Sequence, residues 1–352
     1  MSIMKTFAAA MRRRFQLIPV VFTAAALALL GSGCRTTAGK NAPPPAAGRA
    51  PTLVELHGRL SVRGNKIVDQ AGLPIALHGM SLYSWTPSGK QFYNTSAINH
   101  LAQDWKCTLI RIPVLPRDYQ RNPTNELARV RTVVDACIAN GIYAVVDWHA
   151  MGGAQRDTAS PGTFFTTLAT AYRNTPNVMY EPWNEPVQEA WPVIKAYHET
   201  IIARIRAVDP AAIIICGNRH WDQECAEASL DPITTSTNIA YSIHFYAASH
   251  RQKLRDNGTE ALKNGVALFC TEYGTCSASG GGGFDPAETK LWWDWLAANN
   301  LSCANWSVAP LGETSAAFRP GTNPAGPWTD DMLKPSGRLV HDYLLSVNPT
   351  PP

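Results

Sequence analysis

The chain has 352 residues, of which 45% are hydrophobic, and this is enough for one large globular domain or two ordinary ones. Its formal net charge of +4 belongs to the first residues, because removing residues 1–33 takes away four Lys and Arg and no acid, which leaves 27 of each sign. Balanced charge gives no reason to expect a nucleic acid or an anionic surface as a partner.

The N-terminal residues are typical of an export signal. Lys5 and Arg12–Arg14 precede the apolar run LIPVVFTAAALALLG at 17–31, which is too short for a spanning helix. We expect residues 1–33 to be a signal peptide. Because LLGSGC resembles a bacterial lipoprotein signal, two destinations stay open: a secreted protein, or a protein anchored by a lipid on Cys34 in the periplasm, at the outer membrane or at the cell surface.

A segment rich in Ala, Pro and Gly follows the signal. The stretch RTTAGKNAPPPAAGRAP at 35–51 has no apolar periodicity, so residues 34–53 are predicted to be a linker. No further linker or change of composition interrupts residues 54–348. We therefore expect a single folded domain over that range.

Short runs rich in β-branched residues alternate along this domain with longer segments of helical period. The predicted strands cover residues 75–81, 108–114, 143–149, 178–186, 212–218, 239–246, 266–274 and 303–308. The clearest helical patterns cover 125–141, 193–208 and 286–300, and the first and last end in Asn or Gly, as helices often do. Eight such alternations predict an α/β fold, a single-domain (β/α)8 TIM barrel. A doubly wound open sheet is the alternative, but no GxGxxG follows the first strand.

The chain has eight cysteines and no CxxC pair, so a zinc ribbon is not expected. An exported chain can form disulfides, and Cys216 with Cys225 is the best candidate because the two close a short loop. For Cys270 and Cys303, which lie in apolar runs, burial as small side chains is the alternative.

Polar and aromatic side chains collect toward the carboxyl ends of the predicted strands, where a barrel of this kind places its chemistry. They are Arg111, Asp147, His149, Asn184, Glu185, His244, Tyr246, Glu272 and Trp306. A single charged residue that closes a strand is usually a solvated rim residue. Repetition of the pattern on most strands predicts a site at the mouth of the barrel.

The carboxylates Glu185 and Glu272 end the fourth and seventh strands, so their side chains can face each other across the mouth. Such a pair suits glycoside hydrolysis, in which one carboxyl donates a proton to the leaving oxygen and the other attacks the anomeric carbon. Arg111 can keep one carboxylate ionised and Tyr246 can donate a hydrogen bond to it. Trp306 offers a flat face to a sugar ring. Phosphoryl transfer would need a Gly-rich phosphate cradle, and none is placed to serve.

The same residues leave a metal-dependent barrel hydrolase as an alternative, with Asp147, His149 and His244 as ligands. The HxH pair usual at the end of the first strand of such enzymes is missing, since His78 stands alone. We expect no metal and no other cofactor.

Three stretches of the domain are especially specific, namely YSIHFYAASHRQKLRD at 241–256, FCTEYGTCSASGGGGFD at 269–285 and NWSVAPLGETSAAF at 305–318. With them the chain resembles glycoside hydrolase family 5, and within it the bacterial endoglucanase subgroup. The resemblance begins near LHGRLSVRGNKIVDQAGLPIALHGMSLYSW at 56–85 and covers nearly the whole domain. It implies a (β/α)8 barrel and a retaining mechanism.

Carried over residue by residue, the resemblance makes Glu185 the acid/base and Glu272 the nucleophile. It implies that the supporting and substrate-binding residues are Arg111, His149, Asn184, His244, Tyr246, Trp306 and Glu313. Glu181 matches a strand-four Glu outside the catalytic pair and is expected to be structural.

The chain departs from the family at a few positions that bear on substrate contacts. Leu311 stands where relatives often carry Lys, Leu115 stands where Tyr is common, and Pro182 and Trp183 replace small residues. Trp183 can stack on substrate or pack under the rim, and packing is favoured. Core packing is also expected of three tryptophans of the last helical pattern, Trp292, Trp293 and Trp295.

The resemblance implies a retaining endo-β-1,4-glucanase, a cellulase acting as a monomer on cellulose or a related β-glucan, with carboxyl groups about 5 to 5.5 Å apart. Other retaining β-glycanases of the same fold, such as a mannanase or a mixed-linkage glucanase, stay open. A non-catalytic sugar-binding protein is a remote alternative, and the intact pair of Glu residues argues against it.

Overall fold

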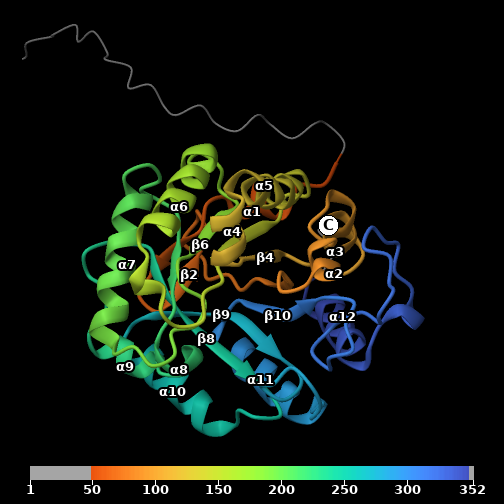
Figure 1. The fold of residues 1–352 in the computed structure, drawn as a ribbon. Coiled ribbons are helices and arrows are strands. Elements are labelled where there is room, and N and C mark those ends of the chain that lie inside the picture. Colours follow the sequence, from red (N-terminus) through yellow and green to blue (C-terminus); the bar gives the residue numbers. More distant parts are fainter. Residues whose placement is uncertain (1–48, 349–352) are drawn as a thin grey trace, which may run out of the picture. The chain divides into compact units, whose positions relative to one another are not determined.

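A computed structural model describes residues 49–348 of the chain. Eight parallel strands close into a barrel in the order β10-β3-β4-β5-β6-β7-β8-β9, and helices surround it (Figure 1). The predicted (β/α)8 fold is confirmed. The barrel strands are β3 (His78–Leu82), β4 (Leu109–Val114), β5 (Tyr143–Trp148), β6 (Val178–Glu181), β7 (Ile214–Cys216), β8 (Ile239–Tyr246), β9 (Ala267–Gly274) and β10 (Cys303–Val308).

Twelve α-helices and two short 3₁₀ helices are found in the described part of the chain. The α-helices are α1 (Leu53–His57), α2 (Pro87–Lys90), α3 (Thr95–Gln103), α4 (Pro116–Arg121), α5 (Pro123–Ala139), α6 (Ala159–Tyr172), α7 (Trp191–Arg206), α8 (Arg219–Asp222), α9 (Cys225–Leu230), α10 (Gln252–Lys263), α11 (Pro286–Asn299) and α12 (Pro335–Val347). The 3₁₀ helices are η1 (Ala154–Arg156) and η2 (Asp330–Met332). Within residues 49–348, no helix is both long and apolar enough to cross a membrane.

Side chains alternate along each strand between the barrel interior and the helices outside. On β4, Leu109 belongs to the interior cluster, whereas Ile110 and Ile112 belong to the large cluster between barrel and helices. Arg111 points inward between them and meets carboxylates of other strands. This period of two explains why the strands are nearly continuous apolar runs with isolated polar residues.

The amino end of the barrel is closed by an N-terminal cap. Helix α1 begins at a capping box, in which Thr52 and Glu55 satisfy each other's backbone N–H groups. Strands β1 (Ser61–Arg63) and β2 (Lys66–Val68) then pair as an antiparallel hairpin. Val54 of α1 and Ile67 of β2 join the interior cluster of the barrel, so the cap seals the end opposite the strand termini that carry the polar residues.

The helical patterns predicted from sequence correspond to α5, α7 and α11. Helices α5 and α11 end as the Asn and Gly signals predicted. Asn140 follows α5, with Gly141 beyond it at φ 63°, and Asn300 follows α11 at φ 55°, in the left-handed region that Asn tolerates. On α11, Trp292 stacks on Phe245, Trp293 stacks on Tyr343, and the indole of Trp295 donates to Thr259, which confirms core packing for these tryptophans.

The predicted disulfide between Cys216 and Cys225 is wrong, because both thiols are free and buried. Cys216 ends β7, and the Cys225 thiol donates to the side-chain oxygen Oδ1 of Asn257 at 3.1 Å, which fixes it toward α10. All seven cysteines among the described residues are buried free thiols. The alternative considered for Cys270 and Cys303, burial as small side chains, is therefore confirmed. Cys34 lies outside the described residues.

Candidate active site

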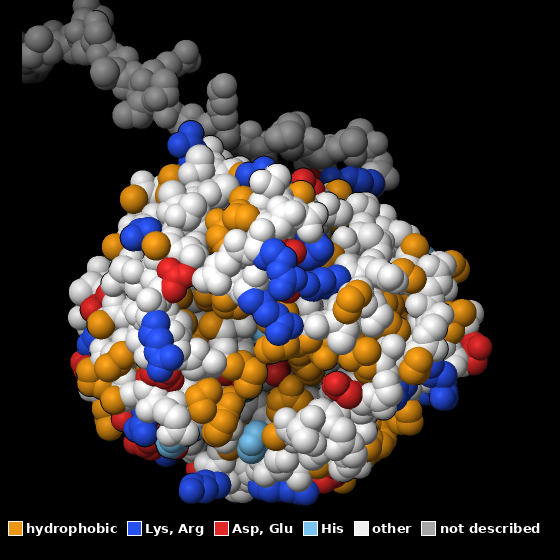
Figure 2. Space-filling view, in the orientation of Figure 1, with side chains coloured by type: hydrophobic (Ala, Val, Ile, Leu, Met, Phe, Trp, Pro, Cys, Tyr) orange, Lys and Arg blue, Asp and Glu red, His pale blue; other side chains and the backbone are white. Residues whose placement is uncertain are grey.

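A pocket of about 750 Å³ opens at the carboxyl ends of the barrel strands. Figure 2 shows this face, with hydrophobic side chains around a hollow at its centre. Of the site residues predicted from sequence, those that line the pocket are His149, Glu185, His244, Tyr246, Glu272, Trp306 and Glu313. Arg111 and Asn184 lie beneath its floor and bond to each other. The structure therefore brings all nine predicted residues together.

Arg111 of β4 is the centre of the floor and is fully buried. Its Nε and Nη2 donate to the two carboxylate oxygens of Glu181, at 2.7 and 3.2 Å, and its Nη1 donates to Glu272 at 2.9 Å. Nη2 also donates to the side-chain oxygen Oδ1 of Asn184 at 2.5 Å and lies 2.9 Å from Asp147 Oδ2. One cation thus fixes side chains from β5, β6 and β9 in a single geometry.

The two buried acids Glu181 and Asp147, which both contact Arg111, have pKa values shifted in opposite directions. Burial opposes ionisation of Glu181, but Arg111 and His244 outweigh it and lower the pKa of Glu181 to about 2. Burial raises the pKa of Asp147 well above its ordinary value despite the same guanidinium. Glu181 is therefore a fixed anion that aligns Arg111, which agrees with the structural role expected of it.

A bulge in β9 turns Glu272 into the barrel. Ser242 pairs with Phe269, whereas His244, two residues later, pairs with Glu272, so β9 carries one extra residue at this point. Thr271 and Glu272 consequently both face inward: Thr271 reaches Glu181 at 2.7 Å, and Glu272 binds Arg111 through one oxygen. Its other oxygen accepts from the Tyr246 hydroxyl at 2.7 Å, the contact predicted for that tyrosine.

Glu185 lies beyond the end of its strand. The sequence predicted a strand to residue 186, but β6 ends at Glu181 and residues 182–185 form a bend. Glu185 is then held by the next loop, because its N–H donates to the Ala150 carbonyl at 3.0 Å and its own carbonyl accepts from Gly152 at 2.9 Å. The bend directs Trp183 away from the pocket and the Glu185 side chain into it.

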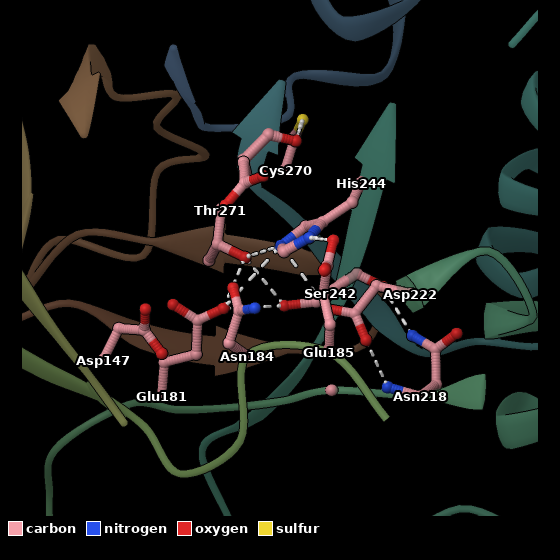
Figure 3. Close-up of polar contacts among 12 residues, drawn as sticks. Asp147, Glu181, Asn184, Glu185, Asn218, Asp222, Ser242, His244, Cys270 and Thr271 are labelled. Atoms are coloured by element: carbon pink, nitrogen blue, oxygen red, sulfur yellow. Dashed lines mark hydrogen bonds and ion pairs between the residues drawn. The ribbon is translucent and has the colours of Figure 1, made fainter. Parts of the chain in front are cut away.

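His244 links Glu185 to the floor (Figure 3). Its Nδ1 lies 3.0 Å from Glu185 Oε1, and its Nε2 lies 2.8 Å from the Thr271 hydroxyl. Burial lowers the pKa of His244, but Asp222, Glu181 and Glu185 outweigh it and raise that pKa well above its ordinary value. His244 is thus a cation beside Glu185 at neutral pH.

The two predicted catalytic carboxyls face each other across the pocket. One oxygen of Glu185 and one of Glu272 lie within 4.8 Å of each other, and a nitrogen of His244 lies within the same distance of both. A second group of this kind is Glu181, Asp222 and His244. These are the sets of described residues whose atoms are close enough to hold a metal ion. His244 belongs to both sets, and its two ring nitrogens already contact Glu185 and Thr271. The ligands of the metal-dependent alternative, Asp147, His149 and His244, are not one of these groups of described residues, although His149 Nδ1 is bonded to Asp147 at 2.7 Å.

Aromatic side chains form one wall of the pocket. Trp306 stacks on His149 with centroids 5.1 Å apart and rings 9° from parallel, and Tyr83 and Trp85 pack against this pair. Burial, followed by Arg111, lowers the pKa of His149 to about 4, so its ring is neutral above that pH. A wall of this kind suits the apolar face of a sugar ring.

Sequence reasoning missed several residues of the pocket. Tyr83 and Trp85 follow the first barrel strand, and Trp221 and Gln223 follow the fifth. The rule that found the others, inspection of the residues just past each strand, would have found these if the first and fifth strands had been extended by a few positions.

The departures from the family near the eighth strand have a structural account. Leu311 packs against the cluster that contains Tyr83, Tyr246 and Trp306, at the edge of the aromatic wall. Lys334, from the segment before α12, donates through its ammonium group to the carbonyls of Leu311, Gly312 and Glu313. This clamp holds Glu313 at the pocket, where its carboxylate accepts from Ser315 at 3.3 Å.

The comparisons with known proteins agree on one group. The family described as Cellulase (glycosyl hydrolase family 5) matches residues 68–312. Endoglucanase Z of Dickeya dadantii is 41% identical over 82% of this chain, and Endoglucanase E-5 of Thermobifida fusca is 34% identical over 86%. The alignments span 66% and 68% of these relatives' own lengths.

Solved structures match over a similar part of the chain. A structure from Cytophaga hutchinsonii has a TM-score of 0.82 and 45% identity, and the match covers 85% of this chain and 98% of that one. The catalytic domain of a Thermobifida fusca endoglucanase in complex with cellotetraose has a TM-score of 0.80 and 33% identity, covering 84% and 99%.

Proposed function

Because this chain belongs to glycosyl hydrolase family 5, we propose that it is a retaining endo-β-1,4-glucanase that cleaves internal bonds of cellulose or a related β-glucan. The observation that carries the proposal is the facing pair Glu185 and Glu272, with oxygens within 4.8 Å. This approach of the nearest oxygens favours double displacement, for which the carboxyl groups lie about 5 to 5.5 Å apart, over inversion, for which they lie about 6.5 to 9.5 Å apart to admit a water.

In the first step Glu272 attacks the anomeric carbon while Glu185 protonates the leaving oxygen. Arg111 and Tyr246 each donate to one oxygen of Glu272, so the attacking carboxylate is held in place and aligned. Glu185 requires a proton at this stage, and His244 at 3.0 Å is its hydrogen-bond partner. The products are a glycosyl ester on Glu272 and the shortened chain.

In the second step water attacks the same carbon and releases Glu272, while Glu185, now ionised, takes the proton of that water. Two displacements at one carbon return the starting anomeric configuration.

Substrate binding is assigned to the aromatic wall and to Asn184. Trp306 and Tyr83 offer flat surfaces to glucose rings. The Asn184 oxygen is used by Arg111, which leaves its amide N–H groups to donate to the hydroxyl beside the reacting carbon. The cellotetraose complex of the Thermobifida fusca relative supports an oligosaccharide ligand for this pocket.

We further propose that the protein acts as a monomer after export, either secreted or lipidated on Cys34. The support for export is the sequence of residues 1–33, which lie outside the described residues. Mass spectrometry of the mature N-terminus would separate these forms, since lipidation adds acyl mass to a chain that begins at Cys34 and secretion adds none. A mature protein that retains residues 1–33 would contradict both.

The activity is tested by a product profile. Purified protein is incubated with carboxymethyl cellulose, mannan, xylan and mixed-linkage glucan, and NMR reads the anomeric configuration of the first product. We expect a rapid fall in the viscosity of carboxymethyl cellulose and a β-configured first product. Preference for mannan or mixed-linkage glucan would select the alternative β-glycanase, and an α-configured product would refute retention.

The roles of the two acids are tested by Glu272→Gln, which keeps shape and removes the nucleophile. Turnover of cellotetraose should fall roughly a thousandfold or more. Glu288→Gln is the matched control, because Glu288 is also a buried glutamate paired with an arginine but lies on α11 outside the pocket. Glu185→Gln should lose turnover of cellotetraose yet form the glycosyl ester quickly from an activated aryl cellobioside, whose leaving group needs no proton.

A further inference from the structure

Asp222 is a buried carboxyl next to the site that no step above uses. It ends α8, is fully buried, and its Oδ1 accepts from the Asn218 N–H at 2.6 Å. Its Oδ2 has no hydrogen-bond partner and lies 3.4 Å from His244 Nε2 (Figure 3). Burying one oxygen of a carboxyl without a hydrogen bond is costly unless a charge compensates it, and the imidazolium of His244 is that charge.

The backbone is strained to place this carboxyl. His220, Trp221 and Asp222 have φ values of 52°, 58° and 61°, so three consecutive residues with side chains occupy the left-handed region. This region is disfavoured for any residue with a Cβ atom, which comes too close to the following carbonyl oxygen there. The turn sends the two last side chains to opposite sides: Trp221 lines the pocket and is 39% exposed, whereas Asp222 points under His244. Strain of this kind persists where the surroundings enforce it, typically at functional sites.

The hydrogen-bond partners of His244 indicate that Nε2, the ring nitrogen that faces Asp222, carries a hydrogen. The Thr271 hydroxyl donates its one hydrogen to Glu181, a fixed anion, at 2.7 Å. At His244 Nε2 the same oxygen can then only accept, so Nε2 carries a hydrogen. His244 Nδ1 and Glu185 Oε1 lie 3.0 Å apart, so a single hydrogen fits between them. This second hydrogen is shared by His244 and Glu185.

We propose that Asp222 is a positioning residue for the acid/base step: its carboxylate, beside His244 Nε2, raises the affinity of the His244–Glu185 pair for their shared proton. This inference rests on the proposed function of Glu185 and adds a third member to its proton path. A negative charge a few ångströms from a titrating pair favours the protonated pair, by about 1 to 3 pH units for a buried neighbour.

Other charged groups surround the pair and have to be held constant in a test. The titratable groups that face Asp222 are His244 on β8, Glu181 and Glu185 from β6 and its bend, Cys216 on β7 and Cys225 on α9. Those that face His244 are Asp222, Glu181, Glu185, Glu272, Asp147 and His250. Burial raises the pKa of Asp222 well above its ordinary value, and the His244 ring 3.4 Å away is the main group that opposes this rise, so the charge of this carboxyl depends on His244.

The test is Asp222→Asn, which keeps an oxygen for the Asn218 N–H and removes the charge. The pH dependence of kcat/KM is measured on cellotetraose for both proteins. We expect the basic limb, where the pair loses its proton, to move to lower pH by at least about one unit in the variant. At pH values below that limb, kcat/KM should stay within a few-fold of the wild type. A purely structural role would lower activity at every pH without moving the limb.

Asp209→Asn is the matched control. Asp209 is also buried, caps backbone N–H groups with one oxygen and leaves the other without a hydrogen bond, but it lies outside the pocket. Its replacement should leave the pH profile in place. If the basic limb of Asp222→Asn coincides with that of the wild type, or moves to higher pH, the proposal is wrong.

A second measurement uses the resting wild-type enzyme, so it remains informative if Asp222→Asn folds poorly. Nitrogen NMR of the His244 ring should show hydrogen on Nε2 through pH 7, and a ring without it would overturn the proposal. A wild type without activity on β-1,4-glucans would refute the proposed function alone, because the NMR titration needs no substrate.

Discussion

Trp183 stands two residues before Glu185, yet its side chain is buried and faces α7. Its ring packs edge-on against Tyr197 with centroids 5.0 Å apart and lies 6.4 Å from the ring of His198. The indole N–H has no partner, so the residue acts as apolar mass under the rim. The expectation of packing is therefore confirmed, and stacking on substrate is excluded by burial.

From this position we predict that Trp183→Ala destabilises the fold without changing substrate affinity. Removing a buried aromatic side chain should lower the free energy of unfolding by about 3 to 5 kcal/mol. KM for cellotetraose should change less than twofold, measured at a temperature where the variant is folded. Trp306→Ala is the paired variant, because Trp306 lines the pocket, and it should raise KM severalfold. A rise in KM with Trp183→Ala would contradict this prediction and indicate that Trp183 contacts the substrate.

At the scale of single residues, the sequence predicted which residues lie at the site but not which of their atoms contact each other. The resemblance named Arg111, Glu185 and Glu272, and all three lie at the site. It could not show that Arg111 binds Glu181 through two nitrogens, because that contact depends on the side-chain register of β4 and β6 across the barrel. Nor did it single out Asp222, whose significance lies in its distance from His244.

At the scale of elements, the β9 bulge decides the geometry of the nucleophile. Without the extra residue, Thr271 and Glu272 would face opposite sides of the strand. With it, Thr271 bridges Glu181 and His244 while Glu272 reaches Arg111 and Tyr246. The bulge thus connects the nucleophile to the proton path of Glu185.

We predict that Thr271→Val lowers turnover more than it alters substrate affinity. The change keeps shape but leaves His244 Nε2 and Glu181 without a shared hydroxyl, at a cost of about 1 to 3 kcal/mol in the free energy of unfolding. Steady-state kinetics should show kcat reduced at least about tenfold with KM near the wild-type value. Thr275→Val is the control, since its buried hydroxyl pairs with Ser336 outside the pocket; it should lose stability and keep kcat. Equal kcat in both variants would contradict the bridging role.

The positions of the strands could be predicted, because they follow from the composition of each segment. Strand ends, bulges and turns could not, because they depend on pairing with neighbouring elements. Apolar runs located all eight barrel strands, because burial on both faces demands such runs. The run at 178–186 predicted too long a strand, since Pro182 lacks the N–H that a continued ladder needs and the chain bends after Glu181. The bulge in β9 and the left-handed turn at α8 depend on neighbouring strands and loops, which a single sequence does not reveal.

At the scale of the whole molecule, the barrel interior divides into two layers. Toward the amino end it is apolar and closed by α1 and the β1–β2 hairpin. Toward the carboxyl end Arg111 and His244 meet a larger number of carboxyls, namely Asp147, Glu181, Glu185, Asp222 and Glu272. Such a layer contributes less to stability than apolar packing would, and it makes stability depend on pH.

Two buried histidines whose pKa values are lowered make the stability of the protein sensitive to acid. Burial lowers the pKa of both His149 and His198 to about 4. His198 donates from Nε2 to the Gly217 carbonyl at 2.9 Å, and its Nδ1 has no partner. Between pH 6.5 and 4 the unfolded chain binds protons that these folded histidines do not, so their neutral burial lowers stability as the pH falls. His244, whose folded pKa is raised, has the opposite sign and loses its contribution as the pH rises.

We therefore predict that His198→Gln reduces the acid sensitivity of the fold. The amide of Gln can still donate toward Gly217, and it does not titrate. Urea unfolding at several pH values should show the wild type losing roughly 3 kcal/mol relative to the variant between pH 7 and pH 4, the size expected for one pKa lowered from 6.5 to about 4. The difference between the two proteins above pH 7 gives the baseline cost of the substitution itself. A constant difference across the whole range would show that His198 takes up its proton in the folded state as readily as in the unfolded chain.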